Sequence, residues 1–389
     1  MISPQSGDTA KWLTLLTDPN PQVTAHVNVM RSGMVLADYP IETAKVTLDR
    51  TAAVRRTCTL TVAPQVGSGT TLDMSWMDLF AAAGNEVRPW FQVTFSDGTT
   101  DEVCLGTFTI VTTKWTFSGT DVTATVSGSD RSYILSEAEA LVPQTLSGVT
   151  VDQAIEQFIS SHNFGVPINY NIVPTSDLVP ATGAIVKPGK TAWSQVTDLA
   201  ASAGYEVFFD NLGTLVGRPI PNPSASAQVL SVDTVSRSGL VTVTSTSTRK
   251  KIYSVFGVVG AGTIEVTSPK TGNLIHKKVA IYGEAADENP GSPTYANGAF
   301  GSIGKLTRSG IVSTQAMATS MSAGLLAQQV GAMTALDVEI LPMPLLDCWD
   351  VVGVSVPMLG VAGAYVVDGW DLTVHFTGTQ TLTVRQVFS

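Results

Sequence analysis

The first and last portions of the chain alternate apolar with polar or small residues at a period of two. The runs Val23–Val29 and Cys58–Val62 show this alternation in the first portion, and turn sequences such as SDGTTD separate neighbouring runs. A period of two predicts strands with one buried face, and short polar turns favour antiparallel neighbours. We therefore predict an antiparallel β-barrel or sandwich over residues 1–141, interpreted as a first tube-like β-barrel domain.

Between residues 142 and 222 the pattern changes from strands to two short amphipathic helices, each followed by an apolar extended stretch. Thr150 and Gln153 fit a capping box at the start of the first helix. The second helix is expected to begin near Thr191 and to stop at Gly204. A hairpin turning at residues 210–213 follows it. The segment predicts a small α+β domain with two helices.

Alternating strands return after residue 223 and continue to the end of the chain, which predicts a second tube-like β-barrel over residues 223–389. Residues 287–304 are rich in Gly, Pro and Asn and predict a long surface loop. A helix is expected from about residue 314 to residue 330. The whole chain is thus predicted to be mainly β, with two antiparallel β-barrels flanking the α+β domain.

Charge argues against a general nucleic-acid binder. The 389 residues carry a formal net charge of −10, and only 14% of them are charged. Binding to the phosphate backbone depends on basic surface, which this balance does not provide. The cluster Arg249, Lys250 and Lys251 is interpreted as a solvated turn or strand edge.

The three cysteines, Cys58, Cys104 and Cys348, lie far apart in apolar contexts. We expect buried free thiols, compatible with assembly in a reducing cytoplasm. The uncharged stretch Val351–Val367 approaches the length of a membrane span. Pro357 and two glycines divide it into strand-sized pieces, so a hairpin is predicted and no integral membrane segment is expected.

The search for catalytic chemistry yields weak candidates only. The four histidines, His26, His162, His276 and His375, form no metal-binding spacing. The run Gly257–Gly262 lacks the lysine and the βαβ setting of a phosphate loop, and it is interpreted as a strand bulge or turn. The acidic pairs Glu137/Glu139 and Asp347/Asp350 are assigned solvated or capping roles. We predict no catalytic, cofactor or metal residues.

Four segments in this order resemble the baseplate-hub or tail-hub proteins of tailed bacteriophages and related contractile injection machines. The first combines LGTFTI, with Gly106 and Phe108, and Asp130–Leu135. The second is the two-helix module, and the third is the late helix MATSMSAGLLAQQ. The fourth is LPMPLLDCWDVVGVSVP followed by GAYVVDGWDLTVHF, in which Asp350 stands where the family often has an aspartate before a barrel strand.

The resemblance implies a structural, non-enzymatic hub that forms a homotrimeric ring in the virion tail tip and is assembled in the cytoplasm of the host bacterium. Such a ring would join the sixfold tail tube to threefold tip components and surround the DNA ejection channel. The implied partners are the tail tube protein, distal tail or baseplate proteins, a tip spike or fibre and the tape-measure protein. An acidic channel wall would limit the sticking of DNA in passage. The chain ends at Ser389 directly after its last strand, which favours a purely structural role.

Two alternatives remain open at this point. One is a tail-associated hydrolase that acts on cell-wall glycan or peptide. The other is a carbohydrate-binding β-sandwich module. Such modules usually expose aromatic platforms, whereas the seven tryptophans here mostly fall in alternating or helical core patterns.

Overall fold

The structure is a computed structural model. It describes residues 1–18, 20–63, 74–119, 121–139, 145–146, 148–162, 165–180, 184–185, 189–234, 239–267, 274–375 and 378–388, and all structural statements refer to them. The expected domain boundary at residues 141 and 142 lies outside this part of the chain.

The N-terminal portion is built almost entirely of strands, as the alternation predicts. A short helix α1 (Thr9–Leu13) and a 3-10 turn precede them, a helix α2 (Met74–Leu79) interrupts them, and α3 (Ser132–Glu137) ends the portion. The strands are β1 (Gln22–Arg31), β2 (Met34–Pro40), β3 (Thr43–Asp49), β4 (Arg56–Val62), β5 (Asn85–Thr94), β6 (Thr100–Cys104), β7 (Phe108–Ser118) and β8 (Asp121–Ser129).

The C-terminal portion returns to strands and contains one longer helix, α6 (Gln315–Ala327), close to the predicted span. Its strands are β14 (Gln228–Asp233), β15 (Leu240–Ser247), β16 (Val255–Thr267), β17 (Leu274–Ala286), β18 (Gly304–Arg308), β19 (Thr334–Ile340), β20 (Val351–Val356), β21 (Val361–Val374) and β22 (Gln380–Gln386). Strands β20 and β21 form the hairpin predicted for Val351–Val367, with Met358 at its tip 98% exposed.

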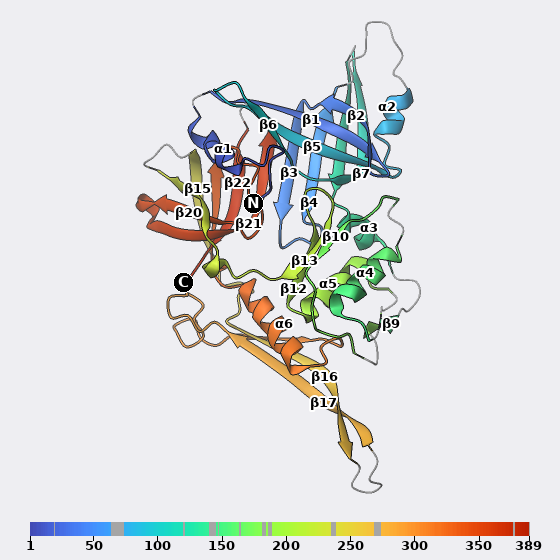
Figure 1. The fold of residues 1–389 in the computed structure, drawn as a ribbon. Coiled ribbons are helices and arrows are strands. Elements are labelled where there is room, and N and C mark those ends of the chain that lie inside the picture. The colour runs from blue at the N-terminus through green and yellow to red at the C-terminus, as the bar shows by residue number, and fades with distance from the viewer. Residues whose placement is uncertain are drawn as a thin grey trace.

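The two β portions are joined edge to edge in one 14-stranded sheet rather than forming two separate closed barrels (Figure 1). Its main path runs β15-β19-β22-β21-β3-β4-β8-β7-β5-β1-β2. Antiparallel pairing of β21 with β3, from Gly369↔Asp49 to Val374↔Ala44, makes the connection. In the described residues no closed barrel is present, so the barrel prediction holds only as far as a mainly antiparallel β architecture.

One hydrophobic core runs continuously under this sheet. Alternate side chains of β3, β4, β8, β19 and β22 point into it, and the outer strands β1, β5, β14 and β20 cover it. Val46, Leu60, Val126, Val338 and Val384 are all fully buried there. The period-two pattern therefore reports correctly which face of each strand is inside.

The middle segment forms the predicted two-helix α+β domain. Its elements are β9 (Thr145–Leu146), α4 (Val151–Ser160), β10 (Tyr170–Ile172), β11 (Ala184–Ile185), α5 (Ala192–Ser202), β12 (Tyr205–Phe209) and β13 (Leu215–Pro219). Gln153 accepts from the backbone N–H of Thr150 at 3.3 Å, and Thr191 caps α5 through Ser194 N. The turn of the β12–β13 hairpin falls at the predicted position, where Asp210 accepts from the N–H groups of Leu212 and Thr214.

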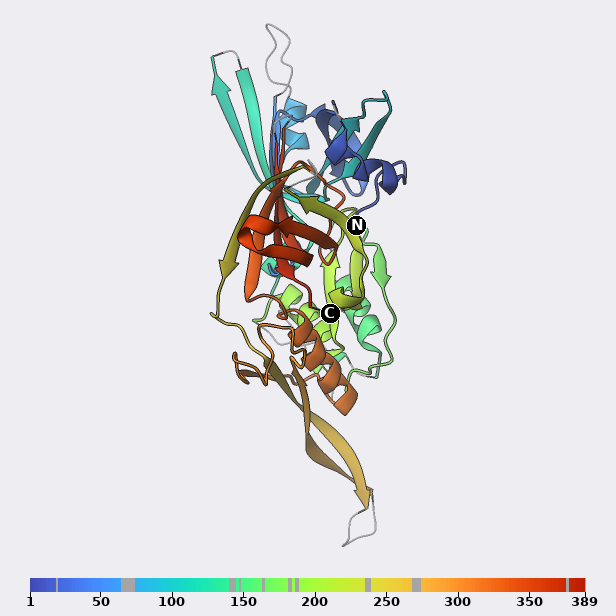
Figure 2. The same ribbon diagram turned by 90° about the vertical axis from the view of Figure 1, so that its left-hand side faces the viewer.

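A two-stranded ribbon, β16–β17, extends away from the body at the end opposite β1 and β2 (Figures 1 and 2). Helix α6 packs across its base, and the glycine run explains how. A Cβ on Gly260 would lie 2.2 Å from the carbonyl oxygen of Val312, and one on Gly283 would lie 2.3 Å from the carbonyl carbon of Ala318. Gly257–Gly262 thus lies within a regular strand, not in the bulge or turn that we predicted, and close approach of the backbone at Val312 and Ser313 accounts for Gly260 and Gly262.

The loop expected at residues 287–304 is irregular but folded on itself. The buried carboxylate of Asp287 accepts from Ser292 Oγ at 2.5 Å and from Thr294 Oγ1 at 2.6 Å. Arg249 lies over the ring of Phe300 at 4.6 Å and donates to its carbonyl at 2.7 Å. The basic cluster is a turn, as predicted, and its first arginine anchors this loop.

Candidate functional site

The residues considered for catalysis lie on separate elements. The two ring nitrogens of His26 contact Asp38 at 2.7 Å and Glu102 at 2.9 Å, while Nδ1 of His162 contacts the Phe158 carbonyl at 2.9 Å. His276 is on β17 and His375 follows β21. In the described ranges, no group of three or more His, Cys, Asp or Glu side chains could hold a metal ion.

The two acidic pairs have structural partners. Asp350 accepts from the N-terminal ammonium of Met1 and from the backbone N–H of Asp347, each at 2.8 Å, and Asp347 binds Arg56 at 2.7 Å. Burial raises the pKa of Asp350. Glu137 ends α3, and Glu139 forms a backbone bridge with Thr191. Glu137 and Glu139 are exposed, in keeping with the predicted solvated role, whereas Asp347 and Asp350 make tertiary ionic contacts that the predicted solvated or capping roles did not include.

Cys58, Cys104 and Cys348 are free and buried, as predicted. Burial raises the pKa of each thiol to about 12, so the reactive thiolate is scarce at neutral pH. No helix in the described part of the chain is long and apolar enough to span a bilayer.

A cleft of about 650 Å³ separates the small domain from α6 and the segment after β13. Its walls are mainly small and apolar, including Gly204, Pro221 and Ala323. Arg385 lies beside the cleft but is held by Asp368 at 3.0 Å. The polar side chains among its described lining residues, such as Asp177 and Asn222, are few and are set among mainly apolar ones.

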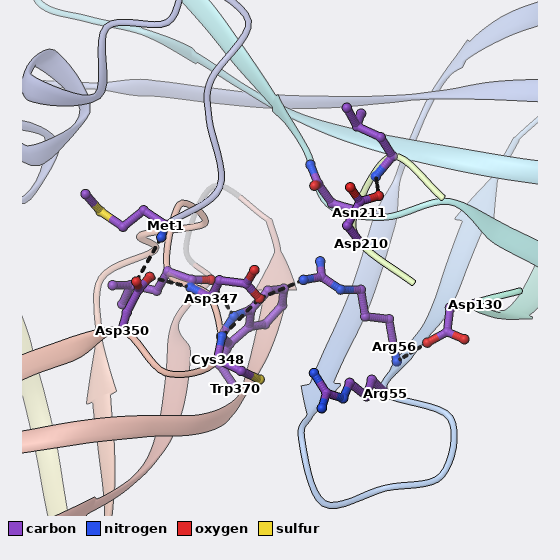
Figure 3. A network of polar contacts seen from close by, with 12 residues as sticks. Met1, Arg55, Arg56, Asp130, Asp210, Asn211, Asp347, Cys348, Asp350 and Trp370 are labelled. Atoms are coloured by element: carbon purple, nitrogen blue, oxygen red, sulfur yellow. Dashed lines mark hydrogen bonds and ion pairs between the residues drawn. The ribbon is translucent and has the colours of Figure 1, made fainter. Parts of the chain in front are cut away.

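Several buried charged groups lie close to the place where the small domain meets the large sheet. Figure 3 shows one chain of contacts there, which runs from Met1 through Asp350 and Asp347 to Arg56 and then Asp130. The side chain of Arg56 is 1% exposed, and the carboxylate of Asp130 accepts from its backbone N–H at 2.8 Å. This series of contacts links the N-terminus, the segment before β20 and the start of β4.

A second group surrounds Trp349, which has a left-handed backbone (φ 73°) although it is large and buried. Such a conformation costs free energy and persists where the surroundings hold it. The indole N–H donates to Glu206 at 3.0 Å, and the guanidinium groups of Arg50 and Arg385 lie 4.5 and 5.2 Å from the ring centre. Trp349 therefore ties the C-terminal part of the sheet to the small domain.

Glu206 on β12 is the carboxylate at the centre of this group. It pairs with Arg55 at 2.7 Å and with Arg218 at 2.8 Å. Burial raises its pKa, but the two guanidinium groups and the indole outweigh burial, so the pKa ends below its usual value. Glu206 remains ionised and is neutralised on both sides.

The third contact is a buried bidentate pair. Arg131 donates to both carboxylate oxygens of Glu86 at 2.7 and 2.8 Å and to the Gly213 carbonyl of the small domain at 2.7 Å. We name these three groups, centred on Arg56, Trp349 and Arg131, the ionic junction. Every carboxylate named in it is paired with a cation or stabilised by hydrogen bonds, so the junction is suited to fixing parts of the chain in place.

Sequence reasoning did not identify the ionic junction. Its arginines are spread over three portions of the chain, and only the local cluster Arg50, Arg55 and Arg56 at the β3–β4 turn could have attracted attention. Asp130 and Asp350, noted for their place in family-like segments, both belong to it.

A repeated strand order is the other notable feature of the molecule. In chain order the strands β3, β4, β7, β8 stand in the sheet as β3-β4-β8-β7, and β15, β19, β21, β22 stand as β15-β19-β22-β21. When the strands of each unit are numbered along the chain, both units therefore have the same order in the sheet: first, second, fourth, third. The two units meet where β21, the third strand of one, pairs with β3, the first strand of the other.

The eight-stranded run ends in β15, the first strand of one unit, and in β7, the third strand of the other. A first and a third strand also pair at the internal joint, and both end strands have an edge that is open along part or all of its length. Strand β15 pairs with β19 alone within the described residues. Strand β7 pairs with β5 only at Phe108 and Thr109, so Thr112–Ser118 has β8 as its single described partner. Phe117 on this open stretch is 73% exposed. The eight-stranded run thus has an open edge along β15 at one end and along Thr112–Ser118 of β7 at the other, and beyond Thr109 of β7 the sheet continues through β5 and β1 to β2.

No family model matches the chain, and no curated protein matches it in sequence. The fold is similar to a tail protein from Neisseria meningitidis MC58, with a TM-score of 0.60 at 15% identity over 93% of this chain and 96% of that chain. The 43 kDa tail protein of prophage MuSo2 from Shewanella oneidensis gives 0.60 at 12% identity, over 93% and 98%. The half-lidded PdpA-VgrG complex of Francisella gives 0.54 at 9% identity, over 98% of this chain and 61% of that one.

These likenesses cover both β portions and the middle domain together. They confirm the resemblance to phage tail proteins at the level of the fold. The chain therefore has a phage tail protein fold.

Proposed function

We propose that the chain is a structural hub subunit of a phage tail tip, and that three copies close into a ring around the DNA ejection channel. The observation that carries the proposal is the repeated strand order with its internal joint, β21 against β3. A joint of the same type between β7 of one copy and β15 of the next would extend the sheet from copy to copy.

The geometry of the run allows such a joint. Its eight strands alternate in direction because every neighbouring pair is antiparallel. An even number of alternating strands leaves β7 and β15 running in opposite directions, so their pairing would also be antiparallel. The open stretches are comparable in length, Thr112–Ser118 and Leu240–Ser247.

The edges also lack the usual protection against pairing. Natural edge strands are commonly blocked by charges, prolines or coverage by another element. The sequence of β15 is LVTVTSTS, with no charge and no proline, and the open part of β7 has one lysine, Lys114. Contacts between unlike patches produce closed rings when the rotation closes.

A threefold ring of such chains would present six similar four-stranded units, which suits a subunit between a sixfold tail tube and threefold tip parts. The partners in this proposal are the tail tube protein, distal tail or baseplate proteins, a tip spike or fibre and the tape-measure protein. The site of action is the virion tail, with assembly in the bacterial cytoplasm. Catalysis has no part in the proposed role.

The test measures the mass of the purified protein, alone and after addition of tail tubes. The same measurement is made on a variant with an altered β15 edge. In Ser245→Lys/Ser247→Lys, two lysines replace exposed serines on β15. The matched control, Ser160→Lys/Ser226→Lys, adds the same charges at exposed serines away from both edges. We expect trimers for the wild type and the control, and monomers of unchanged thermal stability for the edge variant.

Two results would contradict the proposal in different ways. Trimers of the edge variant would remove β15 from the interface. Wild-type monomers that also fail to join purified tail tubes would remove the hub role itself.

A further inference from the structure

One face of the eight-stranded run carries hydroxyl side chains almost throughout, and we name it the hydroxyl face. Its members stand opposite one another across each strand pair, for example Thr59↔Ser127 and Thr47↔Thr57. The hydroxyl residues of this face are Thr242, Thr244, Thr246, Thr381, Thr383, Thr373, Thr43, Thr47, Thr57, Thr59, Thr61, Thr123, Thr125, Ser127, Ser129, Thr112 and Thr116.

The register keeps this face continuous across the joint between the two units. Asp371 on β21 stands opposite Thr47 on β3 and opposite Thr381 on β22. At the two open ends the pattern continues, with Thr112 and Thr116 on β7 and Thr242 and Thr246 on β15. A β7–β15 joint between copies would therefore carry the same face around the ring.

The side chains of the hydroxyl face differ from those on another exposed surface of the same chain, the solvent side of β17. On the β16–β17 ribbon, the solvent side of β17 carries Lys278, Tyr282 and Glu284, long side chains of the kind that ordinary exposed strands display. The hydroxyl face has short β-branched side chains instead, which suit strands and form cross-strand pairs. Exposure to solvent alone thus does not explain the choice of threonine.

The charges on the face are few and mostly acidic. Five acids, Asp49, Asp121, Asp337, Glu339 and Asp371, accompany two lysines, Lys45 and Lys114. The register also places Arg385 on this side of β22, where it is buried and paired with Asp368. The ammonium of Lys45 lies 3.3 Å from Asp371, and Thr383 donates to Asp337 at 3.0 Å. A polyanion that approaches this face meets hydroxyl groups and water rather than a row of cations.

The distribution of strands on the two sides of the run indicates whether the hydroxyl face points toward the centre of a ring or away from it. The apolar side chains of the opposite face pack in one hydrophobic core with those of β1, β5, β14 and β20, so these strands add to the molecule on that side. In a closed ring the side with the additional layer takes the larger circumference, so the thinner side faces the centre. The thinner side is the hydroxyl face.

We propose that the hydroxyl face is the wall of the ring's opening, and that its short neutral side chains let duplex DNA pass without binding. The proposal rests on the ring of the proposed function. DNA affinity comes mainly from lysine and arginine contacts with phosphates, and this wall carries two lysines, one of them paired with an acid. It refines a generally acidic wall into one made mainly of short hydroxyl side chains, with a small excess of acids over lysines.

Cysteine accessibility in the assembled ring tests the position of the face. Thr59→Cys places a thiol on the hydroxyl face, and Ser160→Cys places one on the outer helix α4; both native side chains are exposed. The native cysteines are buried and give a low background. A small methanethiosulfonate and a maleimide on a large polyethylene glycol serve as the two probes.

In monomers, we expect both probes to label both positions. In rings confirmed by mass, the bulky probe should label Thr59→Cys at least about tenfold more slowly, while Ser160→Cys keeps its rate, because thiol labelling follows access. Equal rates at Thr59→Cys in rings and monomers would overturn the wall assignment and leave the hub function intact. If no ring forms, the wall assignment falls together with the proposed function, and the mass measurement identifies that case.

A fluorescent DNA duplex tests the passage claim on the same rings. We expect wild-type rings to show no retention of the duplex at near-physiological salt. Rings of Thr59→Lys/Thr125→Lys should retain it more strongly than rings of the control Ser160→Lys/Ser226→Lys, and added salt should release it. Tight binding by the wild-type ring would overturn the claim.

Discussion

Strands β3 and β4 and the turn between them contribute to both the ionic junction and the hydroxyl face, yet the two regions differ completely in chemistry. The turn between β3 and β4 supplies Arg50, Arg55 and Arg56 to the junction, where they bind carboxylates and the ring of Trp349. The outward positions of the same strands supply Thr47, Thr59 and their neighbours to the hydroxyl face.

This difference shows where the chain uses charge. Buried ion pairs have strong geometric requirements, and breaking one leaves an uncompensated charge. They are placed where three portions of the chain must keep a fixed relation. Exposed positions that face the proposed opening carry mainly neutral hydroxyl groups, whose contacts with any passing polymer are weak and interchangeable. Four predictions test this contrast, from the largest expected effect to the smallest.

Removal of Arg131 should have the largest effect. In Arg131→Met the buried carboxylate of Glu86 loses both of its charged hydrogen bonds, and we expect the free energy of unfolding to fall by about 3–5 kcal/mol. Chemical denaturation measures it. The control is Lys190→Met, which breaks an exposed pair with Asp198 and should cost at most about 1 kcal/mol. Equal losses in the two variants would mean that burial does not distinguish the junction.

Acid should weaken the junction through Glu206. Its pKa is lowered in the folded protein, so its contribution to stability is present above its unfolded pKa of about 4.5 and is lost as the pH falls through the folded value. Glu206→Gln removes this dependence. We expect the stability difference between wild type and variant, from denaturation at several pH values, to be large at pH 7 and to shrink below about pH 4.5. A difference that does not change with pH would refute the ionised state of Glu206.

The exposed ion pair on the hydroxyl face should contribute little. Lys45 and Asp371 have side-chain exposures of 56% and 45% at a separation of 3.3 Å. We expect Lys45→Met to change the free energy of unfolding by at most about 1 kcal/mol, because solvent screens such pairs. A loss as large as that of Arg131→Met would remove the contrast between the two regions.

The smallest effect is expected for a hydroxyl group itself. Thr59→Val keeps the β-branched shape at an exposed strand position, so the thermal midpoint should barely move, consistent with a change within about 0.5 kcal/mol. The variant should assemble as the wild type does. A loss of several degrees would show that the hydroxyl side chains serve the fold rather than the surface.

Local features of the molecule could be predicted from the sequence, and distant pairings could not. Alternation located the strands and their buried faces, and Thr191 and Gly204 marked the ends of α5, because these signals depend on neighbouring residues. The joint of β3 with β21 connects residues more than 300 positions apart, and no local pattern encodes it. The two β portions were therefore predicted as separate barrels.

The candidate site was less predictable for the same reason. Trp349 lies in a segment noted for its resemblance to tail hubs, but its left-handed backbone and its bond to Glu206 depend on tertiary packing. From the sequence, the threonines of β4 and β8 could be identified only as the polar residues that alternate with buried apolar ones. The strand register of the structure shows that they lie side by side on one continuous face.

A cryo-electron microscopy map of the assembled ring, at a resolution that separates strands, tests the central claim most directly. The account predicts three copies, with β7 of each beside β15 of the next and with the threonines of β4 and β8 lining the opening. A map in which these two edges lie apart, or in which the hydroxyl face points outward, would contradict it.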